Sequence, residues 1–230
     1  MVASLGDLIR CVGRVLRSDY ARGVDRDGLI ELLSREISDE RVLRAIESVP
    51  RDLFVPLSRR GDAWENEPLP IGEGQTISQP LVVAEMCEML ELDLGDRVLD
   101  VGTGSGYHAA VLSKLAASVV SIERHPSLTE TARTALKKAG IGNVELVVGD
   151  GSLGWEAEAP YNKINVAAAC EHGPPQPLID QLAEGGHMVI PGGHRGQRLL
   201  LVRKVGGKIT VEKGERVRFV PLIEDGESPG

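Results

Sequence analysis

The 230-residue sequence contains little cysteine. Its three cysteines, Cys11, Cys87 and Cys170, are an odd number, lie far apart and form no C-x-x-C pair. Disulfide frameworks use even numbers of cysteines, and zinc sites need ligands at short spacings. His172 and His194 lie near glycines on expected loops, with no second ligand at metal spacing. We therefore expect no disulfide framework and no metal site, and a protein of the reducing cytoplasm.

The sequence also lacks an excess of basic residues and a long hydrophobic run. Lys and Arg number 26 against 34 Asp and Glu, which gives a formal net charge of −8. This balance argues against bulk non-specific nucleic-acid binding, although a local basic patch stays open. No apolar stretch approaches membrane-spanning length, and the first residues show no signal-peptide pattern. We expect a cytoplasmic protein with no nucleic-acid and no membrane partner.

The stretch from Arg97 to Leu112 reads RVLDVGTGSGYHAAVL and predicts a strand, a glycine turn and a helix. A short β-branched run ends at Val101, three glycines follow at alternate positions, and a helical pattern then resumes. Glycine tolerates positive φ and has no Cβ, so the backbone of such a turn can approach a ligand closely. The turn therefore predicts a cofactor site.

The glycine spacing and the nearby acidic residues indicate which cofactor this site takes. The turn reads G-x-G-x-G, whereas dinucleotide sites read G-x-G-x-x-G. Asp100 precedes the first glycine, where a carboxylate repels a pyrophosphate but suits an ammonium and a sulfonium group. Glu123 ends the next expected strand, near the separation at which a carboxylate accepts from ribose hydroxyls. Asp150 ends the third.

Acids at three successive strand ends resemble the S-adenosylmethionine site of class I methyltransferases. Two alternatives stay open at this point: a glycine turn with acidic caps that binds no ligand, and a nicotinamide site. Ser105 is not a hydrolase nucleophile, because it lacks the glycines that G-x-S-x-G requires on both sides.

Alternating strands and helices predict an α/β fold with a doubly wound, mostly parallel sheet, N-terminal helices and a C-terminal antiparallel β addition. The expected helices are 4–16, 29–37, 38–49, 80–90, 126–138 and 177–182, and the expected strands are 97–101, 119–123, 144–148, 164–169, 187–190, 198–204, 208–212 and 216–220. We expect a single domain, 1–230, which comprises a helical layer (1–50), an irregular loop across the mouth of the site (51–80), a cofactor-binding core (81–193), C-terminal strands (194–222) and a tail (223–230).

The segment from Gly74 to Pro80, GQTISQP, allows two compatible interpretations. In one, Ser78 or Gln79 caps a helix whose first turn holds Pro80. In the other, the hydroxyls of Thr76 and Ser78 donate hydrogen bonds to a substrate carboxylate from a rigid turn.

Several strings, in this order and with these spacings, resemble one family, the protein-L-isoaspartate (D-aspartate) O-methyltransferases. They are PLPIGEGQTISQP, RVLDVGTGSGY, VVGDG, APY, PLIDQL, GGHMVIP and RFVPL, and they cover the chain from about Val49 to Leu222. The glycine turn alone is typical of any class I methyltransferase, whereas G-x-T-I-S-x-P ahead of it is far more specific. The resemblance implies methyl transfer from S-adenosylmethionine to isoaspartyl residues of damaged proteins, by a monomer.

The resemblance also implies roles for residues at matching positions. Ser78 matches the active-site serine and, with Ala168 and Val220, the substrate groove. The implied cofactor contacts are Gln75, Thr76, Ile77, Ser78, Asp100, Gly102, Gly104, Glu123, Arg124, Asp150 and Gly151.

The sequence departs from the family pattern around its fourth expected strand. Asn162 replaces an aspartate, Asn165 puts an amide into an apolar strand, and Cys170 with Glu171 replaces alanine and proline. One interpretation is drift, with Asn165 hydrogen-bonded to a neighbour and Cys170 a buried filler. Another is a changed groove that serves a different carboxylate or one dedicated peptide. A non-catalytic scaffold is the third, against which the intact glycines, the acids and Ser78 argue.

Overall fold

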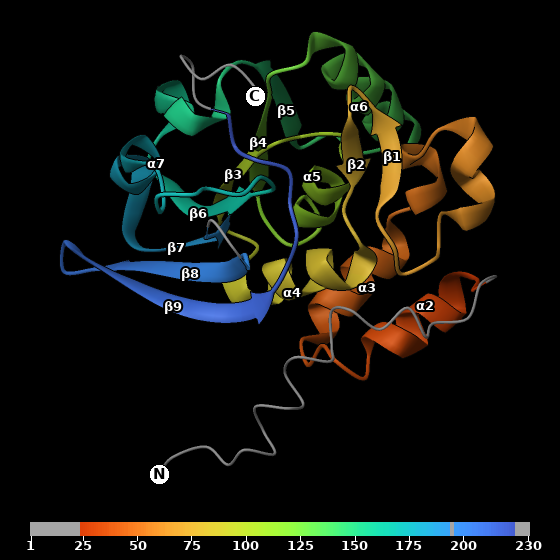
Figure 1. The fold of residues 1–230 in the computed structure, drawn as a ribbon, viewed down its shortest axis with the longest axis horizontal. Helices are drawn as coiled ribbons and strands as arrows, with labels where there is room; N and C mark the ends of the chain where they lie inside the picture. Colours follow the sequence, from red (N-terminus) through yellow and green to blue (C-terminus); the bar gives the residue numbers. More distant parts are fainter. Residues whose placement is uncertain (1–23, 194–195, 224–230) are drawn as a thin grey trace.

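The computed structural model describes residues 24–193 and 196–223, and a seven-stranded sheet forms its centre (Figure 1). The strand order is β5-β4-β3-β6-β7-β8-β9, parallel from β5 to β7 and antiparallel for β8 and β9. The bounds are β3 Arg97–Val101, β4 Ser118–Glu123, β5 Val144–Val148, β6 Tyr161–Val166, β7 Leu182–Gly192, β8 Arg198–Val205 and β9 Lys208–Arg216. The predicted fold class is confirmed.

The sheet has a topological switch point between β3 and β6. From β3 the chain moves outward to β4 and β5, and it then returns to the other side of β3 as β6. In open α/β sheets, ligands bind outside the carboxyl ends of the strands at such a point. The topology therefore places a site after Val101 of β3 and Val166 of β6.

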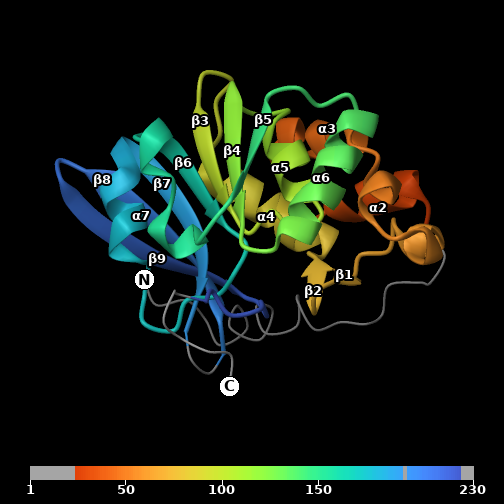
Figure 2. The same cartoon turned by 90° about the horizontal axis from the view of Figure 1, so that it is seen from above.

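Both faces of the sheet are covered, because its central strands are apolar on both sides. In β3, Val98 packs in the core on one face, while Leu99 and Val101 pack in the core on the other. Three helices cover the first face: α4 Pro80–Leu90, α5 Tyr107–Leu112 and α6 Pro126–Lys138. Helix α7 Gln176–Gln181 packs on the other face (Figure 2).

Two N-terminal helices form an outer layer, in which the second packs on α4 and α5 and the first packs on the second (Figure 1). Helix α2, Arg26–Leu33, is capped by Asp25, and α3, Glu40–Ser48, by Asp39. The helix expected at 4–16 lies outside the described residues.

The segment 51–80 has more regular structure than the sequence predicts. It contains two short 3₁₀ helices, η1 Arg51–Phe54 and η2 Leu57–Asp62, and a hairpin of β1 Leu69–Gly72 and β2 Gln75–Ile77. The Gly72–Gly74 turn supplies the positive φ angles that the hairpin needs. These residues break longer periodic patterns, which is why the sequence predicts a loop.

Arg51 anchors this segment from within the core. Its guanidinium is fully buried and donates to the carbonyl oxygens of Ala63, at 2.9 Å, and Ser78, at 2.8 Å. It also lies 4.7 Å from the centroid of the Tyr107 ring, a cation–π contact. Burial lowers the pKa of Arg51 to about 10, so the group stays charged at neutral pH. Arg51 thereby ties the hairpin segment to the start of α5.

The prediction of a strand at 216–220 is wrong. Strand β9 ends at Arg216. The chain then leaves the sheet, and residues 217–223, the crossing segment, run across its carboxyl edge. There the Ala169 N–H donates to the carbonyl of Val220, and the Leu222 N–H donates to the carbonyl of Ala169, both at 2.8 Å. The apolar alternation in this segment reflects packing of Val217 and Phe219 against the main core, not pairing in the sheet. The strand expected at 164–169 also ends earlier, at Val166.

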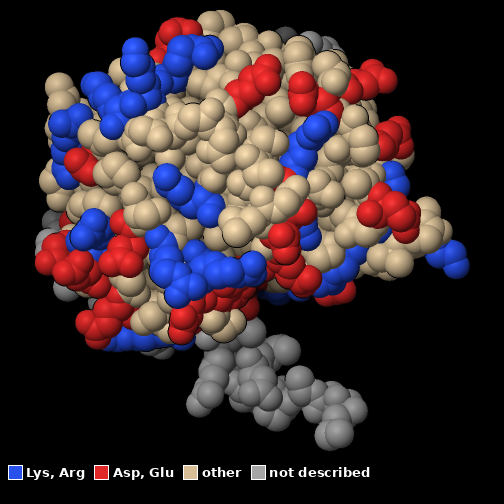
Figure 3. Space-filling view, turned by 180° about the vertical axis from the view of Figure 1, so that it is seen from behind, with Lys and Arg blue, Asp and Glu red and all other residues tan. Residues whose placement is uncertain are grey.

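Acidic and basic residues share the molecular surface, and the cysteines of the described residues are buried. Basic and acidic side chains lie side by side over the lower half of the face in Figure 3. Cys87 and Cys170 are buried free thiols, and Cys170 Sγ lies 3.4 Å from the carbonyl of Pro191. Within residues 24–193 and 196–223, no helix has the length and hydropathy to cross a bilayer, and no acidic, His or Cys cluster could hold a metal.

Candidate active site

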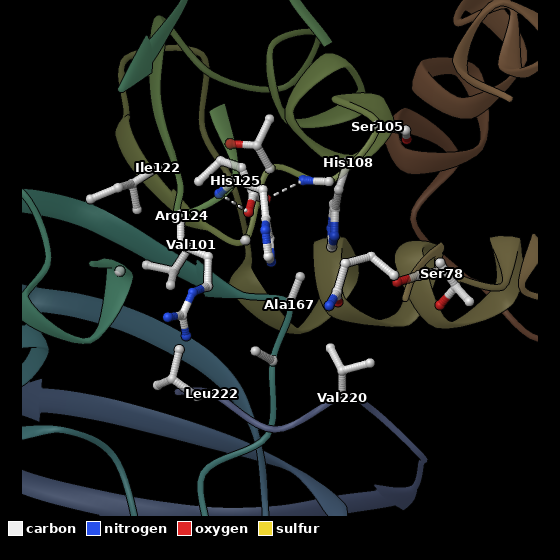
Figure 4. Close-up of a pocket in the computed structure, with 18 of the residues that line it drawn as sticks. Ser78, Val101, Ser105, His108, Ile122, Arg124, His125, Ala167, Val220 and Leu222 are labelled. Carbon is white, nitrogen blue, oxygen red and sulfur yellow. Dashed lines mark hydrogen bonds between the residues drawn. The ribbon is translucent and has the colours of Figure 1, made fainter. Parts of the chain in front are cut away.

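A cavity opens at the switch point (Figure 4). It lies between the glycine turn after β3, segment 75–78 and residues 220–223 of the crossing segment. In that view Arg124 and Leu222 lie at one end, and Ser78 and Val220 at the other. The main lining residues are Gln75, Thr76, Ile77, Ser78, Gly102, Thr103, Gly104, Ser105, His108, Glu123, Arg124, His125, Gly149, Asp150, Gly151, Ala167, Ala168 and Val220.

The glycine turn adopts the left-handed backbone that its sequence predicts. Gly102, Gly104 and Gly106 have φ of 92°, 53° and 86°. A Cβ on Gly104 would lie 3.3 Å from Ile71 of the hairpin, and one on Gly106 would lie 3.0 Å from the Cβ of Ala132 in α6. The glycines therefore permit both the turn and the close packing around it.

Two carboxylates reach the cavity from the ends of β4 and β5. Glu123 accepts from the Gly104 N–H at 2.9 Å and from the His125 N–H at 3.0 Å, so the glycine turn fixes its carboxylate. Asp150 accepts from the N–H and the hydroxyl of Ser152, at 2.8 and 2.7 Å. Glu123 keeps lone pairs for hydroxyl or amine donors of a ligand, and Asp150 brings a second carboxylate to the same cavity.

Asp100 lies apart from the other expected cofactor residues, and its role as a cofactor contact stays a prediction. Its side chain is fully buried beneath the turn and does not line the cavity. It accepts from Ser121 Oγ and from Asn165 Nδ2, both at 2.7 Å. Thr103 Oγ1 lies 2.6 Å from Ser121 Oγ, so Asp100 supports the turn through two hydroxyls. In a strand, alternate residues face opposite sides, which turns Asp100 away from the ligand edge.

Burial decides the protonation of Asp100. Desolvation raises its pKa from 3.8 to about 6, while the hydrogen bonds from Ser121 and Asn165 oppose that rise and Glu123 adds to it. Asp100 is therefore a carboxylate at neutral pH, held by donors on two sides.

Asn165 connects this buried carboxylate to His108, a contact that sequence reasoning missed. Its Nδ2 donates to Asp100 and also, at 3.2 Å, to His108 Nδ1. Because an amide nitrogen cannot accept, we assign the His108 proton to Nε2, which lies 3.6 Å from Cys87 Sγ. Burial lowers the pKa of His108 to about 3. A neutral, fixed imidazole thus forms part of the cavity wall.

Segment 75–78 brings Ser78 to the cavity but not as a helix cap. Gln79 is the N-cap residue of α4, without a side-chain cap bond, and Pro80 occupies the first turn. The carbonyl of Ser78 accepts from the buried Arg51, which fixes the backbone of Ser78. Its hydroxyl makes no hydrogen bond with any residue in the described part of the chain and is free to donate to a ligand.

The altered fourth-strand residues lie outside this cavity. Asn162, Asn165, Cys170 and Glu171 are absent from the described lining, whereas Ala168 and Val220 belong to it. Asn162 instead accepts from the Arg97 N–H at 2.9 Å, at the opposite end of β6. Asn165 reaches the cavity wall only from behind, through its hydrogen bond to the lining residue His108.

Apart from Asp100, the structure brings every expected cofactor and substrate residue to one cavity. Their individual roles stay predictions. Sequence reasoning missed His108, His125 and Ala167; the position of His108 in the first turn after the glycines was the available signal.

The sheet order, the glycine turn after β3 and the acidic end of β4 define a Rossmann-like class I methyltransferase. A solved structure described as protein-L-isoaspartate O-methyltransferase matches with a TM-score of 0.78 and 31% identity, over 87% of this chain and 67% of that chain. A Plasmodium falciparum structure, provisionally described as the same enzyme in complex with S-adenosyl-L-homocysteine, matches with a TM-score of 0.77 and 26% identity, over 87% and 99%.

Sequence comparison identifies the family. The profile of protein-L-isoaspartate(D-aspartate) O-methyltransferase matches residues 25–227. The chain is 52% identical to the protein-L-isoaspartate O-methyltransferase of Methanoculleus marisnigri, over 86% of this chain and 91% of the relative. It is 48% identical to that of Vibrio campbellii, over 84% and 92%. The chain belongs to the protein-L-isoaspartate(D-aspartate) O-methyltransferase family.

Proposed function

We propose that the protein transfers a methyl group from S-adenosylmethionine to the free α-carboxylate of L-isoaspartyl residues, and to the side-chain carboxylate of D-aspartyl residues, in damaged proteins. One observation carries this proposal beyond the family match. The glycine turn with Glu123 and the unpaired hydroxyl of Ser78 meet in one cavity, so a cofactor and a carboxylate can lie next to each other there.

The residues present suit S-adenosylmethionine. Glu123 and Asp150 offer acceptors for ribose hydroxyls and amines, and the turn of Gly102 and Gly104 offers close backbone approach. Arg124 and segment 75–78 contribute the remaining proposed contacts. Asp100 acts from below by holding Thr103 in place. When bound, the cofactor supplies an electrophilic methyl group on a sulfonium.

The chain does not need a strong base for this reaction. An α-carboxyl group has a pKa of about 3.3 to 3.7, so the substrate oxygen is already ionised at neutral pH. His108 cannot abstract a proton usefully, since its ring nitrogens are both engaged and its pKa is near 3. Placing the nucleophile in line at about 3 Å is then the main task, and orientation can supply several kcal/mol.

Ser78 and the apolar wall perform that task in this proposal. The Ser78 hydroxyl donates to one carboxylate oxygen and leaves the other for attack; it is not a covalent nucleophile. Ala167, Ala168 and Val220 exclude water beside it. The product ester can lose methanol, whereas the carboxylate has no comparable leaving group. The following backbone nitrogen can therefore attack the ester carbonyl, give up its proton and expel methanol to close a succinimide. Water then opens the succinimide, partly to aspartate.

A repair assay tests this function. An isoaspartyl peptide is incubated with the enzyme and S-adenosylmethionine, and the isoaspartyl, succinimide and aspartyl forms are separated by chromatography. We expect the isoaspartyl form to decline and the aspartyl form to accumulate. An isoaspartyl peptide that remains unchanged while the enzyme binds cofactor would support another carboxylate substrate instead.

We further propose that the enzyme acts as a monomer in the cytoplasm. The buried free thiols of Cys87 and Cys170 support a reducing compartment. A solution mass near 24.7 kDa by light scattering is expected, and twice that value would overturn the monomer.

A further inference from the structure

A second groove continues outward from the active site along the crossing segment. It shares Thr76, Ser78, Ala167, Val220 and Pro221 with the cofactor cavity. Beyond them its lining includes residues 216–219, Pro68, Gln79 and Val82. A polypeptide whose modified residue reaches Ser78 can therefore continue along this groove.

The charge in this groove has one sign. Arg216 and Arg218 are the only charged residues in its described lining, and both are exposed. Neither forms an ion pair with another residue in 24–193 or 196–223. Two cations without a described acidic partner stand out in a protein with a net charge of −8.

The backbone that carries these arginines is held in place. The side-chain amide of Gln197 accepts from the Phe219 N–H at 2.6 Å and donates to the Phe219 carbonyl at 3.3 Å. The Val217 N–H donates to the Gln197 carbonyl at 2.9 Å, and the Val217 side chain is buried. Anchoring the residues between and beside the arginines fixes the direction from which their charges reach the groove.

We propose that Arg216 and Arg218 select isoaspartyl sites with a neighbouring Asp or Glu residue. This inference rests on the proposed function and names its preferred substrates. Arg218 lies two residues before Val220 and Arg216 four, or at most about 7 and 13 Å along an extended chain. An acidic side chain about two to four residues from the isoaspartate therefore meets the arginines.

Matched peptides test the preference. Each contains one isoaspartate and carries Glu, Gln or Lys two, three or four residues away, in one series on the amino side and in another on the carboxyl side. The quantity measured is the ratio of kcat/KM for the Glu peptide to that for the Gln peptide. We expect about 3- to 10-fold in at least one series at low salt, as two exposed charge pairs supply.

Variants assign the preference to this groove. Arg216→Gln with Arg218→Gln should bring the ratio close to one, and since the ratio is taken within one variant, a general loss of activity cancels. Lys208→Gln with Lys213→Gln makes the same charge change on exposed residues of β9 that do not line the groove, and it should keep the wild-type ratio. In the wild type, the ratio should also shrink as salt rises from about 0.05 to about 0.5 M.

The outcomes separate this inference from the proposed function. Equal use of Glu and Gln peptides in both series, or a preference that survives loss of both arginines, overturns the inference while methylation of isoaspartate persists. Failure to methylate any isoaspartyl peptide overturns the proposed function itself.

Discussion

At the residue scale, the acids at the three strand ends differ in what they are bonded to. Glu123 is bonded to backbone N–H groups of the glycine turn and its flank, and Asp150 to a neighbouring serine. Asp100 is bonded to side chains of β4 and β6 in the interior. The first two can face a ligand, whereas the third stabilises the turn from below.

The buried carboxylate predicts a pH dependence of stability. Because the pKa of Asp100 rises from 3.8 to about 6 on folding, the folded state keeps a proton between those pH values that the unfolded chain has lost. Ionisation therefore destabilises the fold as pH rises from about 4 to about 6, by about 3 kcal/mol in all.

Asp100→Asn removes this titration. Urea unfolding at pH 4 and pH 7 should show the wild type losing about 3 kcal/mol relative to the variant between the two values. An unchanged difference would contradict the burial argument. We also expect Asp100→Ala to weaken S-adenosylmethionine binding, because Ser121 and Thr103 lose their anchor.

Ser78→Ala tests the proposed carboxylate donor. A hydrogen bond to a charged group contributes about 1.5 to 3 kcal/mol, so kcat/KM should fall about 10- to 100-fold. S-adenosylmethionine affinity, measured by calorimetry, should stay within a few-fold. The exposed Ser58 provides the control, since Ser58→Ala should leave both quantities unchanged. Normal turnover in the Ser78 variant would mean that the site is misplaced.

Residue types at motif positions were predictable from sequence, but the direction of a side chain in a strand was not. Asp100 was expected in the site because the motif marks its position, not the face of β3 that it occupies. The sequence allows a hydrogen bond from Asn165 to a neighbour, and the structure confirms such a bond. Its partners Asp100 and His108 are 65 and 57 residues away in sequence, so only the fold shows them.

At the element scale, the packing of α5 on α6 depends on Gly106. Its φ of 86° would be strained for a residue with a side chain. A Cβ on this residue would also lie only 3.0 Å from the Cβ of Ala132, which is too close for unstrained packing. Gly140 has a φ of 69° but open space around it, so a side chain added there would cause backbone strain without overpacking.

Gly106→Ala should therefore destabilise the protein more than Gly140→Ala does. Left-handed backbone costs about 1 to 2 kcal/mol in both variants, and overpacking adds about 1 to 3 kcal/mol at Gly106 alone. Denaturant titration of the two variants measures the difference. Equal losses would mean that α6 moves away without cost.

The crossing segment depends on Gln197, which bonds both backbone groups of Phe219. Gln197→Ala should raise the KM for an isoaspartyl peptide about 3- to 10-fold, since each lost bond contributes about 1 kcal/mol. The Kd for S-adenosylmethionine should change little. Gln176→Ala, which removes an exposed amide from α7, is the control. A variant with wild-type KM would show that the segment does not shape the groove.

Elements with strong periodicity and clear end signals were predictable, as α6 at Pro126–Lys138 and β5 at Val144–Val148 show. The β1-β2 hairpin was not, because each strand is very short and prolines interrupt the pattern. The false strand at 216–220 has the opposite cause. Its alternating apolar residues, Val217 and Phe219, pack against the main core, and alternation cannot distinguish that packing from pairing in a sheet.

At the scale of the whole molecule, three parts of the chain that are distant in sequence build one site. The sheet supplies the turn and the acids, the segment tied down by Arg51 supplies Ser78, and the C-terminal crossing segment closes the groove. The sequence motifs indicate each of these parts separately. Their convergence follows from the switch point of the sheet and from a crossing segment that no local pattern predicts.

The most direct test of the account is methyl transfer from labelled S-adenosylmethionine to two peptides that differ only in isoaspartate or aspartate at one position. We predict base-labile label on the isoaspartyl peptide alone, because only that residue presents a free α-carboxylate. Equal labelling of both peptides, or cofactor binding with no label on either, would contradict the account.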